Sequence, residues 1–93
     1  MSGDRVSLVL YITGDGPRAR SATANLKALC GGALKGHCDF SVVDVLEYPE
    51  NAERDRILAT PTLVKLEPEP VRRVIGDLSD AGSVLAALDI VSD

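Results

Sequence analysis

The sequence predicts one α/β domain over residues 1–93, built on a four-stranded mixed sheet, and three observations carry that prediction. The chain has 93 residues, 45% hydrophobic and 26% charged, which is typical of a single folded domain with a modest core. Two β-branched apolar runs flank a segment with helical spacing within residues 6–46, which indicates a strand–helix–strand unit with parallel strands. Two further alternating runs on either side of a short connector indicate an antiparallel hairpin.

The first strand and the first helix occupy residues 6–12 and 18–30. The run VSLVLYI contains no charge, so we expect a strand that is buried on both faces of the sheet. The turn at residues 14–17 ends this strand, and its Pro17 suits the first turn of a helix. Apolar residues then recur at helical spacing until a pair of glycines ends the helix.

The remaining elements complete the order βαβαββα. Residues 40–46 (FSVVDVL) read as a second strand, and residues 49–58 as a short, heavily charged helix. Residues 62–66 and 71–75 alternate as two half-exposed strands, and Ser79 can cap a last helix. Helices on both faces of a four-stranded mixed sheet give the thioredoxin-like layout.

Composition argues against two broad functional classes. The net charge is −4, and the chain has only two tyrosines and one phenylalanine, which argues against nucleic-acid binding. No apolar run is long enough to cross a membrane, and no signal peptide opens the chain. We therefore expect a cytoplasmic protein that binds neither membrane nor nucleic acid.

A glycine-rich turn after the first strand resembles a dinucleotide-binding pattern. Gly14, Gly16 and Ala19 have the spacing of the loose G-x-G-x-x-A form. However, Pro17 lacks the backbone N–H that a pyrophosphate needs, and Asp15 places a negative charge beside it. We expect a tight turn here and no cofactor.

The two cysteines are expected to be free thiols. Cys30 and Cys38 are too few for a disulfide framework, and a cytoplasmic setting keeps thiols reduced. One alternative is a disulfide between them, and another is a metal site that also includes His37. A metal site would need a fourth ligand, which the sequence does not offer at the usual spacing, so we expect no metal.

Thiol catalysis is not expected either. A thioredoxin-like enzyme needs a thiol at the start of the first helix, where the helix dipole lowers its pKa, and the sequence has none there. Pro61 does occupy the position of that fold's cis-proline, just before the third strand. We expect the fold without the chemistry, and no residue stands out as catalytic.

Basic side chains gather in the second half of the chain. Lys65, Arg72 and Arg73 lie on the predicted hairpin, and Arg56 lies on the preceding helix. Adjacent residues of a strand point to opposite faces, so Arg72 and Arg73 face different sides of the sheet. Such charges either protect an edge strand or dock an acidic protein surface, and these four residues are our candidates for partner binding.

Two longer motifs in the same half are ILATPTLVK at residues 57–65 and PVRRVIGDLSD at residues 70–80. With VDVL at residues 43–46 and LY at residues 10–11, they closely resemble the KaiB family of circadian clock proteins. The resemblance covers residues 6–90.

The resemblance implies a regulator and not an enzyme. KaiB proteins bind the N-terminal ATPase domain of the hexameric KaiC ring, and in cyanobacteria that complex captures KaiA. The family is metamorphic: its ground state is a homotetramer with the order βαββααβ, and the KaiC-binding monomer is thioredoxin-like. The segment that refolds corresponds to about residues 47–93.

Several residues are candidates for controlling that switch. Pro61, Pro68 and Pro70 are candidates because X-Pro bonds isomerise slowly. Ala87 stands where relatives often carry glycine, and alanine favours a helix by about 1 kcal/mol. Ala87 leads us to expect that the chain leans toward the thioredoxin-like state. Asp89, two residues further on, is a further switch candidate.

Two other functions fit the same fold. One is a thiol oxidoreductase that uses Cys30 or Cys38, which the missing N-terminal thiol disfavours. The other is a KaiB-like sensory domain of a histidine kinase. The complete RRVIGDLSD segment and the short chain favour a stand-alone protein over this alternative. In the thioredoxin-like state the second strand lies at an edge of the sheet, where another chain could pair with it.

Overall fold

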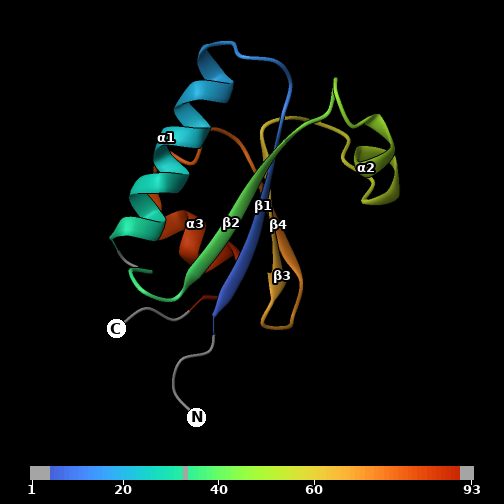
Figure 1. Ribbon diagram of the computed structural model, residues 1–93. Coiled ribbons are helices and arrows are strands. Elements are labelled where there is room, and N and C mark those ends of the chain that lie inside the picture. Colours follow the sequence, from blue (N-terminus) through green and yellow to red (C-terminus); the bar gives the residue numbers. More distant parts are fainter. Residues whose placement is uncertain (1–4, 33, 91–93) are drawn as a thin grey trace.

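The computed structural model describes residues 5–32 and 34–90 and confirms the predicted order of elements (Figure 1). In chain order they are β1 (Val6–Ile12), α1 (Pro17–Gly31), β2 (Cys38–Asp44), α2 (Pro49–Arg54), β3 (Thr62–Glu67), β4 (Arg72–Ile75) and α3 (Ala81–Ala87). The second strand begins earlier than predicted, at Cys38, and α2 ends earlier, at Arg54.

The strands form one mixed sheet in the order β2-β1-β3-β4. β1 pairs in parallel with β2, from Val6 opposite Cys38 to Ile12 opposite Asp44, because α1 returns the chain to the end where β1 began. β3 runs antiparallel to β1, and β4 runs antiparallel to β3. The predicted four-stranded mixed sheet is confirmed, with β2 and β4 at its edges.

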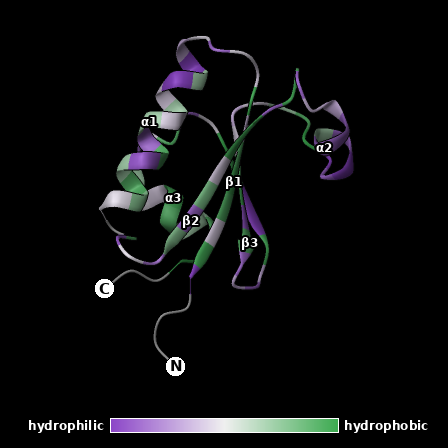
Figure 2. Cartoon of the chain, viewed as in Figure 1, coloured by the Kyte–Doolittle hydropathy of each residue, from purple (hydrophilic) through white to green (hydrophobic). Residues whose placement is uncertain are grey.

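The core lies between the sheet and the two helices α1 and α3, which cover the same face (Figure 1). Hydrophobic residues concentrate along β1, whereas α2 is largely hydrophilic (Figure 2). Each fully buried leucine contributes roughly 1.5–3 kcal/mol by leaving water, so this layer carries most of the packing energy. The cluster comprises Val6, Leu8, Leu10, Ala22, Leu26, Leu29, Leu34, Leu63, Leu78, Val84 and Leu88.

The opposite face of the sheet, here called the open face, carries Ser7, Val9 and Tyr11 of β1 and is covered only at one end. Ser7 and Val9 are half-buried, and Leu66 of β3 is 43% exposed. α2 lies on this side of the sheet, but none of its residues is buried. The prediction that the first strand is buried on both faces is therefore wrong, because α2 is too short to cover more than one end.

The last helix is capped by a different residue from the one predicted. The carboxylate of Asp80 accepts hydrogen bonds from the backbone N–H of Ser83 at 3.1 Å and from its hydroxyl at 3.0 Å. These bonds lower the pKa of the Asp80 carboxyl. Ser79 stands one residue too early to cap, and its own N–H donates to Asp77. The predicted cap is wrong by one position.

The three prolines of the second half flank β3. The Thr60–Pro61 peptide bond is cis, as predicted from the fold, and Pro61 is buried beside the start of the strand. Its carbonyl oxygen accepts a hydrogen bond from the N–H of Gly76 at 2.9 Å, which ties the start of β3 to the end of β4. Pro68 and Pro70 are exposed in the β3–β4 connection and also follow cis bonds.

Candidate interaction site

The two adjacent arginines of β4 have different surroundings. Arg72 lies opposite Lys65, and Arg73 lies opposite Val64 and faces the open face. The guanidinium of Arg73 donates hydrogen bonds to the carbonyl oxygens of Asp55 at 2.9 Å and Arg56 at 3.1 Å. Arg73 therefore ties β4 to the residues that follow α2, where helix carbonyls lack intrahelical partners.

A second contact holds the same end of α2. The hydroxyl of Tyr11 donates a hydrogen bond to the carboxylate of Asp55. Burial, and then the hydrogen bond and negative charge of Asp55, raise the pKa of Tyr11 to about 12. Nothing in the sequence paired Tyr11 with Asp55, because the two residues lie on separate elements.

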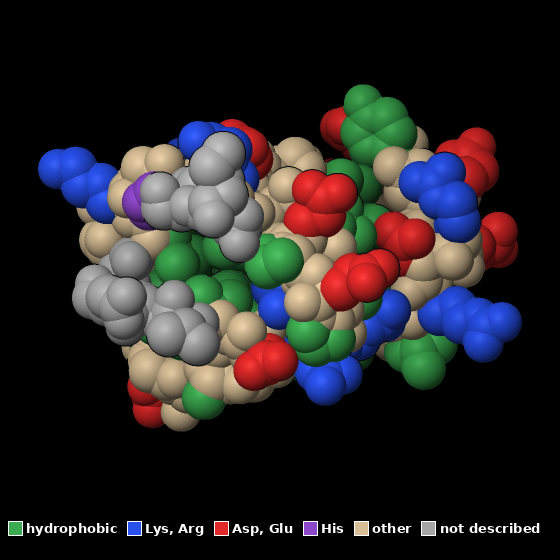
Figure 3. Space-filling model, turned by 90° about the horizontal axis from the view of Figure 1, so that it is seen from below, with side chains coloured by type: hydrophobic (Ala, Val, Ile, Leu, Met, Phe, Trp, Pro, Cys, Tyr) green, Lys and Arg blue, Asp and Glu red, His purple; other side chains and the backbone are tan. Residues whose placement is uncertain are grey.

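Arg56 and Arg72 are the two partner-binding candidates whose side chains are exposed and make no side-chain hydrogen bond within the described residues. Arg56 has a backbone φ of 55°, in the left-handed region, at the turn between α2 and β3. Seen from below, the end of the molecule that carries α2 shows basic and acidic side chains side by side (Figure 3). A partner that docks there would have to match a mixed charge pattern and not a uniformly basic patch.

Lys65 has the opposite placement. It lies on the face of β3 that packs against the helices, and only 1% of it is exposed. Its ammonium nitrogen lies 3.5 Å from the carbonyl oxygen of Asp89. Asp89 follows the C-terminal end of α3, where a positive charge is favoured by the helix dipole. In this conformation Lys65 links β3 to the end of α3 and does not reach the surface.

The end of α3 gathers both C-terminal switch candidates. Ala87 is its last residue, and the N–H of Asp89 donates to the carbonyl of Ala86 at 3.1 Å. The N–H of Ile90 donates to the carbonyl of Leu85 at 2.9 Å, which completes a Schellman motif. Asp89 occupies the left-handed position of that motif, with φ of 59°, where glycine is the favoured residue.

This geometry predicts opposite effects for two glycine substitutions in the same turn. Ala87→Gly is expected to lower the stability of this conformation by up to about 1 kcal/mol, because it removes a good helix former. Asp89→Gly is expected to raise it by about 0.5 kcal/mol, because glycine adopts the left-handed conformation without a steric cost. Urea unfolding of the two variants, with size-exclusion chromatography to follow the oligomer, measures both. Shifts of the same sign would contradict this account.

The structure corrects the expectation of free thiols. Cys30 and Cys38 form a disulfide, with their Cα atoms 5.5 Å apart. The strand–helix–strand unit brings the end of α1 beside the start of β2, within the usual bridging distance. The bridge uses the two sulfurs that a metal site with His37 would need. Among residues 5–32 and 34–90, no group of three His, Cys, Asp or Glu side chains is placed to hold a metal.

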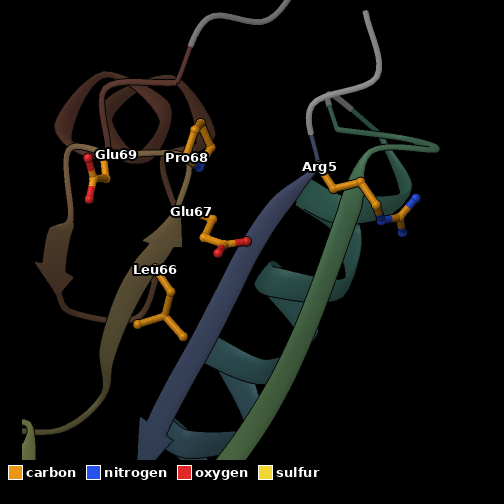
Figure 4. A pocket seen from close by; sticks show the side chains of 5 residues that line it. All are labelled: Arg5, Leu66, Glu67, Pro68 and Glu69. Carbon is orange, nitrogen blue, oxygen red and sulfur yellow. The ribbon is translucent and has the colours of Figure 1, made fainter. Parts of the chain in front are cut away.

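An open groove of about 500 Å³ lies between the end of β3 and the start of β1 (Figure 4). Its lining carries two carboxylates, while the side chain of Arg5 points away from them and donates to Asp39 at 2.7 Å. That ion pair lowers the pKa of the Asp39 carboxyl. The lining includes no histidine, serine, cysteine or lysine; it consists of Arg5, Leu66, Glu67, Pro68 and Glu69. Nor does any helix in the described ranges have the length and apolarity to cross a membrane.

β2 forms one edge of the sheet. β2 pairs with β1 on one side only, so the other side presents unpaired peptide groups. Its side chains are also exposed from Asp39 to Val42. An edge of this kind can accept a strand from another protein.

Comparison with known sequences gives the chain's relatives. A family model described as KaiB domain matches residues 9–90. Circadian clock protein KaiB3 of Synechocystis sp. is 43% identical over 93 residues, which cover 100% of this chain and 91% of that protein. Circadian clock oscillator protein KaiB of Prochlorococcus marinus subsp. pastoris is 49% identical over 86 residues, which cover 92% of this chain and 80% of that protein.

Comparison with solved structures gives the fold. The N-terminal domain of SasA from Synechococcus elongatus matches 96% of this chain and 88% of its own, with a TM-score of 0.73 and 24% identity. The thioredoxin Deadhead of Drosophila melanogaster matches 91% of this chain and 82% of its own, with a TM-score of 0.73 and 17% identity. At these identities the likeness speaks for the fold alone, and the predicted thioredoxin-like fold is confirmed.

Proposed function

Because the chain belongs to the KaiB family of circadian clock proteins, we propose that it is a non-enzymatic clock regulator that binds the N-terminal ATPase domain of a KaiC-type hexamer in the cytoplasm. The observation that carries the proposal is the family match over residues 9–90, which spans every strand and helix of the fold apart from the first residues of β1.

The surface supports a role in binding. The edge of β2 offers unpaired backbone groups, and the exposed charges of Arg56 and Arg72 can steer an acidic partner. Lys65 and Arg73 act indirectly, because each holds the conformation that presents these groups. The lining of the open groove includes no histidine, serine or cysteine.

We further propose that this conformation is the binding-competent one of two. The alternative is a homotetrameric ground state with the order βαββααβ, reached by refolding of residues 47–93. Pro61, Pro68, Pro70, Ala87 and Asp89 all lie in that segment, and Ala87 and Asp89 build the end of α3. Two packings of one sequence interconvert when they differ by only a few kcal/mol. Capture of KaiA by the assembled complex is part of the same proposal.

The direct test is to mix the chain with a KaiC-type hexamer and ATP and to follow the mass of the complex for hours by native mass spectrometry. Arg72→Glu and Arg56→Glu are each expected to weaken binding about tenfold, because a reversed charge repels an acidic partner. Arg18→Glu is the matched control, since Arg18 is also exposed but lies at the start of α1.

Two outcomes would count against the proposal. One is the absence of any complex with either ATP or ADP. The other is a loss of binding in Arg18→Glu as large as that in the two test variants. The rival function, thiol oxidoreduction, is tested on the same preparation by insulin reduction, where no turnover is expected because the disulfide lies at the C-terminal end of α1.

A further inference from the structure

We propose that the Cys30–Cys38 disulfide is a reversible redox clasp that holds the first residues of the edge strand β2 against α1. Cys30 lies in the last turn of α1, and Cys38 is the first residue of β2. Reduction is inferred to loosen the start of this strand while the rest of the sheet stays folded.

The clasp matters because few other side chains of β2 pack against the rest of the protein. Among its first five residues, Cys38 is the only one that is not exposed. Further along, Val43 and Asp44 are half-buried and fix the other end of the strand. The start of β2 is therefore held to the helical layer by one covalent bond.

Apart from the backbone ladder with β1, the other contacts at this end are weak or belong to the loop. Arg5 and Asp39 form an ion pair, but their side chains are 52% and 61% exposed, and such surface pairs contribute little. The N–H of Val6 donates to the carbonyl of His37 at 2.7 Å. Leu34 is buried in the core and anchors the middle of the loop whether or not the bridge is present. Loss of the bridge is thus expected to increase the mobility of β2 more than that of the loop or the rest of the sheet.

The bridge is accessible to a reductant, and both basic and acidic residues lie near it in the sequence. Both cysteines are half-buried and not fully enclosed. Lys27 lies one turn before Cys30, and Lys35 lies within the bridged loop. The end of α1 disfavours a negative charge on Cys30, so Cys38 is the better leaving group.

The reaction balances with a dithiol as the reductant. One thiolate of the dithiol attacks the sulfur of Cys30, the S–S bond breaks, and the sulfur of Cys38 leaves and takes up a proton from water. The second thiolate of the dithiol then attacks the mixed disulfide, which releases Cys30 as a thiol and the reductant as its own disulfide. Two electrons pass from the dithiol to the protein, and an oxidised dithiol reverses the step.

The clasp bears on partner binding because β2 presents the open edge. A strand that is already ordered loses less entropy when another chain pairs with it, so the oxidised form is expected to bind the tighter of the two. This consequence rests on the proposed function. The effect of the clasp on β2 itself does not.

The test compares the full chain, air-oxidised and treated with dithiothreitol, by hydrogen exchange and mass spectrometry. Reduction is expected to speed exchange in a peptide covering residues 38–44 by about tenfold, while a peptide covering residues 62–67 keeps its rate. The doubly substituted chain, Cys30→Ser with Cys38→Ser, is expected to exchange like the reduced protein whether or not dithiothreitol is present. The unfolding equilibrium is expected to shift by roughly 50-fold between the oxidised and reduced forms.

Three results would overturn the proposal: free thiols in the air-oxidised protein on labelling with iodoacetamide, resistance of the bond to dithiothreitol, or equal exchange of β2 in the two forms. A mixture with a KaiC-type hexamer separates this question from the proposed function. If neither form binds the hexamer but β2 responds to reduction, the clasp stands and the proposed function fails. If β2 exchanges equally in the two forms but binding is normal, the clasp fails and the proposed function stands.

Discussion

Leu63→Ala is expected to lower the free energy of unfolding of this conformation by about 2–5 kcal/mol. Leu63 is fully buried in β3, opposite Leu10 of β1, within the single core layer beneath α1 and α3. Truncation removes most of its apolar surface from the core and leaves a cavity that rigid strands on both sides cannot close. Urea unfolding followed by circular dichroism measures the change.

Leu66→Ala is the matched control for Leu63→Ala. Leu66 belongs to the same strand but lies on the open face and is 43% exposed. Its replacement is expected to change the free energy of unfolding by less than about 0.5 kcal/mol. Equal losses for the two variants would mean that Leu66 is as well packed as Leu63, contrary to its exposure.

Arg73→Met is expected to destabilise the conformation by about 1.5 kcal/mol, because the guanidinium makes charge-assisted hydrogen bonds to the carbonyls of Asp55 and Arg56. Methionine keeps the apolar stem while removing both bonds. Asp55 and Arg56 then lose their hydrogen bonds to β4, while the hydrogen bond from Tyr11 to the Asp55 carboxylate remains. Thermal unfolding, with exchange of the amides of α2, measures the global and the local effect.

Arg72→Met separates stability from binding. Arg72 is the neighbouring residue, points to the other face and is exposed, so its replacement is expected to leave the stability within about 0.5 kcal/mol of the parent. Under the proposed function it weakens binding to the hexamer, whereas Arg73→Met acts through the fold. If the Arg72 variant is the less stable of the two, the assignment of these roles is wrong.

Much of the fold was predictable because local rules and the overall topology agree. The uncharged run of β1 predicted a central strand, and the strand–helix–strand spacing required β1 and β2 to be parallel. The cis bond before Pro61 followed from the layout and not from the tripeptide itself. The open face was not predictable in the same way, because its exposure depends on how far the short α2 reaches.

The site was less predictable than the fold. The sequence showed that Arg72 and Arg73 face opposite sides, but not that Arg73 meets carbonyls seventeen and eighteen residues away. The sequence predicted that Lys65 is a surface charge, and the structure buries it. Alternation along a strand does not reveal that the end of α3 packs over this residue. Free thiols were expected because a cytoplasmic setting keeps thiols reduced. Whether Cys30 and Cys38 can form a bridge depends instead on the distance between the end of α1 and the start of β2, which the sequence does not give.

The order of the strands divides the sheet into two parts that meet between β1 and β3. Of the described residues, those up to Asp44 form one module, β1-α1-β2, and those after α2 form another. The two modules meet in a ladder of five residue pairs between β1 and β3 and in the core beneath α1 and α3. Separating the two modules means breaking that ladder and exposing the shared core, while β1 and β2 keep their own parallel pairing. The earlier module is thus a fixed frame, and its newly bared strand edge would be open to whatever arrangement the later module takes up next.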